Sequence, residues 1–177
     1  MLKDPLASQI LAVLFVAKEP VSIPQLHQVF PETSSQDLSR LVREVAKEFN
    51  TVQDSVEIRQ VAGGYRMNSH ARHHETIRRY LKSRPSARLS LAALETLAVI
   101  AYKQPVTMPE IAEIRGVKGT STIRTLLEKK LIEAQGRKKT VGRPILYGIG
   151  RQFLVHFGLN DLSELPTLAE FEEILSS

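Results

Sequence analysis

The side chains in this sequence with the clearest chemical potential are cations that could bind phosphate groups. Residues 115–151 contain ten basic side chains and two acidic ones, a net charge of +8, whereas residues 152–177 contain five acids and no Lys or Arg. A concentrated basic segment is typical of contact with polyanions such as nucleic acid. The same cations could instead stay solvated or pair with the acidic end of the chain, and the sequence leaves both interpretations open. The candidate phosphate ligands are Arg124, Arg137, Lys138, Lys139 and Arg143.

Residues that would perform catalysis or bind a metal are poorly represented. The chain contains no Cys, which removes thiol nucleophiles and thiolate metal sites. The sequence GRKKTVGRP at 136–144 superficially resembles a phosphate-binding loop but lacks the GK[ST] ending. His70 and His74 could share a helix face, yet no carboxylate or Cys motif completes a metal site there, and Arg72 would repel a cation. We therefore expect no enzyme, no catalytic, cofactor or metal site, and no small-molecule substrate.

A nine-residue motif occurs twice and indicates how the chain is built. KEPVSIPQL at 18–26 and KQPVTMPEI at 103–111 are 85 residues apart, and an apolar helical stretch precedes each. Ser22 with Gln25, and Thr107 with Glu110, match the capping box that begins a helix. The repeat therefore predicts one small fold that is present twice.

The hydrophobic periodicity predicts the same order of elements in both halves. The first half has helices at 4–17, 24–30 and 34–49, a strand at 56–61, a Gly63-Gly64 turn, a return strand at 65–67, and a connecting helix at 70–83 buried along Ile77, Tyr80 and Leu81. The second half has helices at 90–102, 108–114 and 120–130, the last burying Ile123, Leu126 and Leu127, and strand-like segments at 131–135 and 145–150. A further helix containing Phe153, Leu154 and Phe157 closes the second core, toward which Tyr102 and Tyr147 also point.

Three helices followed by a hairpin form a winged helix, in which the hairpin is the wing. The expected fold class is therefore mainly α with small β-hairpin wings, in two tandem winged-helix domains. The expected boundaries are an N-terminal domain with its connecting helix at 1–82, a linker at 83–89, a C-terminal domain at 90–160, and an acidic tail at 161–177 with a short helix capped by Thr167 and Glu170. No stretch approaches the roughly 20 apolar residues of a membrane span, so no membrane partner is expected.

The second half also resembles a known family. ALETLAVIAYKQPVT, EIRGV, GR-x5-GRP-x-LY and FGL-x-x-L-x-x-LP are similar to the motifs of bacterial segregation and condensation protein B, the ScpB family. The resemblance covers residues 89–166 strongly and the first half more loosely. It implies a homodimer of tandem winged-helix chains in a condensin-like complex with the kleisin ScpA and, through the kleisin, an SMC ATPase. It also implies a cytoplasmic, nucleoid-associated role in chromosome condensation and partition during cell division.

Two functions remain to be distinguished at this point. The first is the non-enzymatic, kleisin-binding subunit that the resemblance implies, although it assigns no kleisin-binding residues here. The second is a winged-helix transcription regulator, which should present base-reading side chains at the start of its recognition helix. The segments SSQDLSRLVREVAKEF and GTSTIRTLLEKK are poor in such residues, which favours protein binding. We expect the dimer contact within residues 1–80, and weak, non-specific DNA binding by the second wing.

Overall fold

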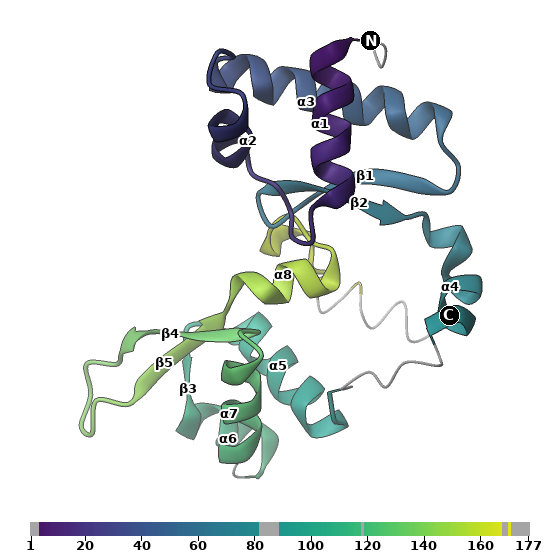
Figure 1. Cartoon of the computed structure of the whole chain (residues 1–177). Coiled ribbons are helices and arrows are strands. Elements are labelled where there is room, and N and C mark those ends of the chain that lie inside the picture. Colours follow the sequence, from purple (N-terminus) through teal and green to yellow (C-terminus); the bar gives the residue numbers. More distant parts are fainter. Residues whose placement is uncertain (1–3, 82–88, 118, 168–169, 171–177) are drawn as a thin grey trace. The chain divides into compact units, whose positions relative to one another are not determined.

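The two copies of the repeated motif lie in two separate folding units (Figure 1). The structure, a computed structural model, describes residues 4–81, 89–117, 119–167 and 170. The described residues up to 81 and those from 158 onward form the first unit, and the described residues from 89 to 157 form the second. Each unit combines three helices with an antiparallel hairpin, which confirms the predicted pair of mainly α winged-helix domains.

The first unit packs three helices against one hairpin. Its elements are α1 (Pro5–Val16), α2 (Ile23–Val29), α3 (Ser35–Val52), β1 (Val56–Val61) and β2 (Gly64–Ser69). Side-chain caps fix where the helices begin: Asp4 accepts two backbone N–H groups of α1, and the Ser22 hydroxyl and the Gln25 side chain cap α2 reciprocally. Ile10, Leu26 and Leu38, one from each helix, are fully buried together and form the centre of the core.

The turn of the first hairpin lies one residue earlier than predicted. Val61 pairs with Gly64, so Ala62 and Gly63 are the turn residues, with φ of 50° and 75°. This is the left-handed geometry of the two-residue turns that match the twist of a hairpin. Gly64 is needed within the strand because a Cβ there would lie 2.9 Å from the carbonyl carbon of Val21. The expected Gly63-Gly64 turn was therefore wrong: the second glycine allows a close backbone approach.

The connecting helix after the hairpin is more exposed than predicted. It begins as a short 3-10 turn, Ala71–His73, and continues as α4 (His74–Leu81). Ile77 is half-buried, but Tyr80 and Leu81 are 71% and 45% exposed, so their predicted burial was wrong. None of the three side chains belongs to the core of the three helices, because α4 follows the hairpin instead of packing on that core. The predicted linker lies outside the described residues except for Leu89.

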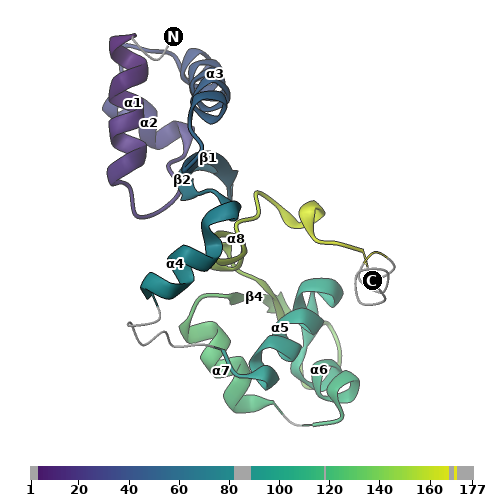
Figure 2. The same ribbon diagram turned by 90° about the vertical axis from the view of Figure 1, so that its right-hand side faces the viewer.

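The second unit repeats this arrangement with one additional strand and a closing helix (Figure 2). Its elements are α5 (Leu91–Lys103), β3 (Val106–Thr107), α6 (Met108–Arg115), α7 (Thr120–Glu128), β4 (Ile132–Arg137), β5 (Ile145–Ile149) and α8 (Arg151–Phe157). The strands form an antiparallel sheet in the order β3-β5-β4. Figure 2 shows α5 between α6 and α7, and its buried Leu97 and Ile100 form the centre of this core.

The two units match residue by residue around the repeated motif. Val21 forms a β-bridge with Tyr65, and Val106 pairs in the same way with Tyr147. The buried positions 7, 10 and 14 of α1 recur at 93, 96 and 100 of α5, a spacing of 86 residues instead of the 85 that separates the motifs. One residue fewer therefore separates the helix from the motif in the second unit. Position 96, a Thr, consequently occupies the place of Ile10 in the first core.

Several predictions for the end of the second unit need correction. Helix α7 ends at Glu128, and Leu127 is 36% exposed, in contrast to the buried Ile123 and Leu126, so its predicted burial was wrong. Phe153 is buried, but Phe157 is half exposed and stacks on it with ring centroids 4.6 Å apart.

The segment after α8 contacts the first hairpin, although the sequence analysis placed residues 158–160 with the second domain. The Ala62 N–H donates to the Leu159 carbonyl (2.9 Å), and the Gly63 N–H donates to the Asn160 side chain (3.1 Å). Further along, the Thr167 N–H donates to the Glu170 carboxylate (2.7 Å), but the rest of the predicted acidic helix lies outside the described residues. Among the described helices, none combines the length and the apolar character needed to cross a bilayer.

Candidate partner and nucleic-acid interfaces

The hairpin of β4 and β5 carries four of the five predicted phosphate ligands. Figure 1 shows this hairpin reaching beyond the helices of its own unit. Its tip is held by three hydrogen bonds: the Lys138 N–H to the Pro144 carbonyl (2.9 Å), the Arg143 N–H to the Thr140 carbonyl (2.9 Å), and the Arg137 guanidinium to the Arg143 carbonyl (3.0 Å). Val141 at the tip is fully exposed. The hairpin therefore presents a defined, strongly basic tip to solvent.

The five predicted cations do not have equal freedom to bind a phosphate. The Lys138 ammonium pairs with the Glu110 carboxylate of α6 (2.5 Å), and Arg124 pairs with Glu128 one turn along α7 (2.9 Å). In the described part of the chain, no carboxylate pairs with Arg137, Lys139 or Arg143. The sequence alone does not separate the five cations, because it does not show that Glu110 lies beside Lys138 and Glu128 beside Arg124.

Glu110 connects the base of the hairpin to the start of α6. Besides Lys138, its carboxylate accepts the Thr107 N–H (2.8 Å) and the Thr107 hydroxyl (2.7 Å). The hydrogen bond from Lys138, followed by those from Thr107, lowers the pKa of Glu110 from an ordinary 4.5 to about 2. The residue that the repeat identified as a helix cap therefore also anchors the wing.

Glu110→Gln is expected to reduce stability at neutral pH, with an effect that fades in acid. A carboxyl group whose pKa is lowered by folding contributes fully above its unfolded pKa, and the contribution is lost as pH falls through the folded value. The stability difference between the variant and the native chain should therefore shrink from pH 4.5 toward about 2. Urea denaturation at successive pH values, from neutral to the acid limit of folding, measures it.

Glu113→Gln provides the matched control, since Glu113 is an exposed carboxylate on the same helix and lies outside the cap formed by Thr107 and Glu110. It should change stability little at any pH. A constant difference between Glu110→Gln and the native chain across the acid range would show that the Glu110 charge does not stabilise the fold.

Arg115 belongs to the basic segment by sequence but not to its exposed surface. Its side chain is 8% exposed, and its guanidinium donates to the Thr96 hydroxyl and pairs with the Glu95 carboxylate, both at 2.7 Å. These contacts join α5 to the end of α6. The motifs ALET and EIRG, 20 residues apart in the sequence, therefore meet in one polar cluster.

The exposed side of α5 carries an apolar surface that the sequence analysis missed. Leu91, Leu94, Ala98 and Tyr102 follow one another at helical spacing and are all exposed; we call them the α5 stripe. Leu91 is 73% exposed and Tyr102 is 37% exposed, so the predicted core position of Tyr102 was wrong, whereas Tyr147 is buried as predicted. The available signal was that α5 carries apolar residues beyond its buried face, with Glu95 and Lys103 as its charged side chains, which is unusual for a helix that faces water.

The end of α6 adds to the apolar surface near the α5 stripe. Ile114 and Val117 are each 53% exposed, and they flank Arg115, whose pairing with Glu95 ties this end of α6 to the exposed side of α5. Exposed apolar side chains of this size, gathered on one unit, are typical of a protein-binding site. In the first unit, Phe15 and Val16 at the end of α1 are also strongly exposed.

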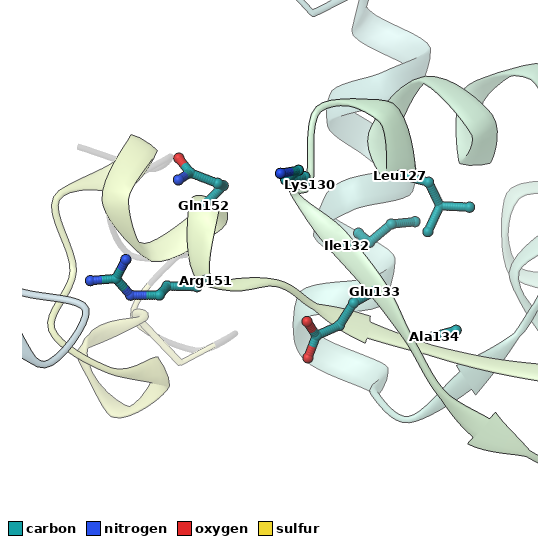
Figure 3. Close-up of a pocket in the computed structure, with 7 residues that line it drawn as sticks. All are labelled: Leu127, Lys130, Ile132, Glu133, Ala134, Arg151 and Gln152. Carbon is teal, nitrogen blue, oxygen red and sulfur yellow. The ribbon is translucent and has the colours of Figure 1, made fainter. Parts of the chain in front are cut away.

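A shallow groove lies where α7, β4 and α8 meet in the second unit (Figure 3). It has a volume of about 440 Å³ and is lined by Leu127, Lys130, Ile132, Glu133, Ala134, Arg151 and Gln152. These side chains include no nucleophile beside a base, so the groove suits contact better than catalysis. Among the described residues, no three metal-ligating side chains come together, and the His70 ring accepts hydrogen bonds from Arg72.

Comparisons with known proteins agree over nearly the whole chain. A family model described as segregation and condensation complex subunit ScpB matches residues 8–168. Segregation and condensation protein B of Desulforamulus reducens is 44% identical over 97% of this chain and 93% of its own length. The Myxococcus xanthus protein of the same name is 42% identical over 97% of this chain, which spans 51% of that longer relative. A crystal structure of ScpB from Mycobacterium tuberculosis is 30% identical with a TM-score of 0.41, covering 87% of this chain and 95% of that one.

Proposed function

Because this chain belongs to the family of the segregation and condensation complex subunit ScpB, we propose that it is a non-enzymatic subunit that binds the kleisin ScpA. Through the kleisin it associates with an SMC ATPase, and the complex acts on the nucleoid, in the cytoplasm, during chromosome condensation and partition in dividing cells. ATP hydrolysis belongs to the SMC partner, so this subunit needs no catalytic site of its own.

The observation that carries the proposal is the α5 stripe together with the exposed end of α6. An amphipathic helix or an extended segment of a partner binds by placing apolar anchors in such a surface. Leu91 and Leu94 would lose water contact on binding, and each buried apolar side chain of this size contributes roughly 1.5–3 kcal/mol. A kleisin segment is therefore held mainly by apolar contacts.

The alternative, a transcription regulator that reads an operator, is supported less well. The cations at the start of both candidate recognition helices are paired with acids of the same helix, Arg40 with Asp37 in α3 and Arg124 with Glu128 in α7. Base recognition requires side chains that are available to donate to base edges in the major groove. This pairing favours the subunit over the regulator.

Co-purification from a native lysate tests the proposed function. A tagged full-length chain should retain the kleisin and the SMC ATPase at stoichiometric levels, identified by mass spectrometry of the retained proteins. A kleisin-deleted strain is the control, since loss of the kleisin should also remove the ATPase. Retention of specific operator fragments without either protein would instead support the regulator.

The homodimer is expected to form through the first unit. Phe15 and Val16 leave an exposed apolar end on α1, beyond what the small core of that unit uses. Light scattering should report twice the chain mass for the full-length protein and a monomer for a fragment of residues 88–177. A dimeric fragment would move the dimer contact to the second unit.

A further inference from the structure

The tip of the second hairpin combines a high density of positive charge with an absence of acids. Residues 137–143 include Arg137, Lys138, Lys139 and Arg143 and contain no Asp or Glu. Lys139 and Arg143 are exposed, and they flank Val141, which is fully in solvent. In the described part of the chain, an ion pair accounts for Lys138, which contacts Glu110, but not for Arg137, Lys139 or Arg143.

The hydrogen bonds of the hairpin give its four cations different roles. The ammonium of Lys138 turns back to the Glu110 carboxylate, so this lysine fastens the base of the tip to α6. Arg137 donates to the Arg143 carbonyl and thereby closes the tip across its two strands. Arg143 itself has a left-handed backbone, with φ of 40°, and its N–H is bound to the Thr140 carbonyl. The backbone of the tip is therefore organised before any ligand binds.

From this arrangement we propose that the tip of the second hairpin binds the phosphate backbone of duplex DNA through Arg137, Lys139 and Arg143, with Lys138 as a positioning residue. Phosphate contacts require cations and backbone N–H groups but no base-specific side chains. The intervening residues Thr140, Val141 and Gly142 are small and allow the hairpin to lie close to a duplex. DNA binding by this tip is independent of kleisin binding by the α5 stripe, because the two sets of residues do not overlap.

A DNA partner fits the tip better than an acidic protein surface does. Energetically important residues of protein interfaces are enriched in Trp, Tyr and Arg, and they are packed in desolvated pockets near the centre of the interface. The only apolar side chain at the tip, residues 137–143, is Val141, and the other large exposed apolar residues described in this unit lie on the helices or, for Val117, just after α6. Because the tip offers charge without an apolar anchor, its affinity should depend strongly on salt and little on sequence.

Fluorescence anisotropy with the full-length chain and a labelled duplex of mixed sequence tests the proposal. We expect a dissociation constant of roughly 10⁻⁴–10⁻⁶ M at physiological salt, as for other non-specific DNA contacts. The double variant Lys139→Gln with Arg143→Asn should weaken binding for all sequences and flatten the log–log salt slope by about one for each lost contact. Asn is chosen at 143 because it tolerates a left-handed backbone better than most residues.

A matched control removes two exposed cations from the first unit, Lys18→Gln with Lys47→Gln, and so has the same net charge as the variant of the tip. It should retain the native salt slope, and circular dichroism should show that both variants fold. The proposal is overturned by an absence of binding at low salt, by an equal loss in the control variant, or by strong preference for one duplex sequence. It is also overturned if polyglutamate displaces the protein as effectively as unlabelled DNA at equal charge.

Discussion

Leu94→Glu should weaken the binding of purified kleisin about a hundredfold. Leu94 lies in the middle of the α5 stripe and is 43% exposed, so the free chain can accept Glu there without disturbing its core. In the complex the new carboxylate would be desolvated in place of an apolar anchor. Losing the burial of a leucine costs roughly 1.5–3 kcal/mol, desolvating an unpaired carboxylate adds to this cost, and about 1.4 kcal/mol corresponds to a factor of ten in affinity. Titration calorimetry measures the change directly.

Leu162→Glu is the matched control, since Leu162 is an apolar residue of similar exposure (39%) in the segment after α8. It introduces the same charge outside the α5 stripe and should leave the affinity within about twofold of the native value. Equal losses in both variants would mean that the effect comes from net charge and not from the α5 stripe. Native binding with Leu94→Glu would exclude the stripe as the kleisin site.

The salt dependence of the native chain separates the two kinds of interface on this molecule. Apolar burial is not screened by ions, whereas exposed charge pairs more than a Debye length apart, about 8 Å at physiological ionic strength, are largely screened. Kleisin affinity should therefore change little between low and high salt, in contrast to the DNA affinity of the hairpin tip. A fall in kleisin affinity by orders of magnitude at high salt would indicate an electrostatic interface instead.

Local chemistry explains which elements the sequence could predict. A capping side chain bonds to a backbone group three residues away, so Ser22 with Gln25 specifies the start of α2 regardless of the rest of the fold. Asp4 and Ser90 mark the beginnings of α1 and α5 in the same way. The alternation of apolar and polar residues at the start of β1, from Val56 to Arg59, is likewise a signal between neighbouring residues. Element order and fold class follow from such short-range signals.

Contacts between distant residues explain what the sequence could not predict. The true turn of the first hairpin depends on Val21, whose backbone leaves no room for a side chain at position 64. Lys138 differs from the other cations of the tip because it is paired with Glu110, which lies 28 residues earlier in the sequence. Because α5 has apolar residues on more than one face, helical spacing alone does not decide which of them face the core, and Tyr102 was assigned to the wrong face. The candidate site was therefore predicted less completely than the fold.

The cluster formed by Thr96 and Arg115 shows how the two units solve the same packing problem differently. Thr96 matches Ile10 in the burial pattern, and Arg115 matches Phe30 by the spacing of the repeated motif. In the first unit Ile10 is in the apolar core and Phe30 packs against it. In the second unit the corresponding contact is a hydrogen bond from a nearly buried guanidinium to a buried hydroxyl. The same helices are thus joined by an apolar contact in one unit and a polar contact in the other.

Arg115→Phe is therefore expected to destabilise the second unit by about 1.5–3 kcal/mol, the usual value of a hydrogen bond to a charged group. The variant leaves the Thr96 hydroxyl facing an aromatic ring and removes the partner of Glu95. Adding Thr96→Ile should restore most of the loss, because the pair then has the apolar composition of the first unit, and replacing a buried polar pair by apolar residues is often neutral. Urea denaturation of the two single variants and the double variant completes a double-mutant cycle. Additive losses of stability would show that the two positions act independently. The apolar pair of the first unit could then not replace the polar pair of the second.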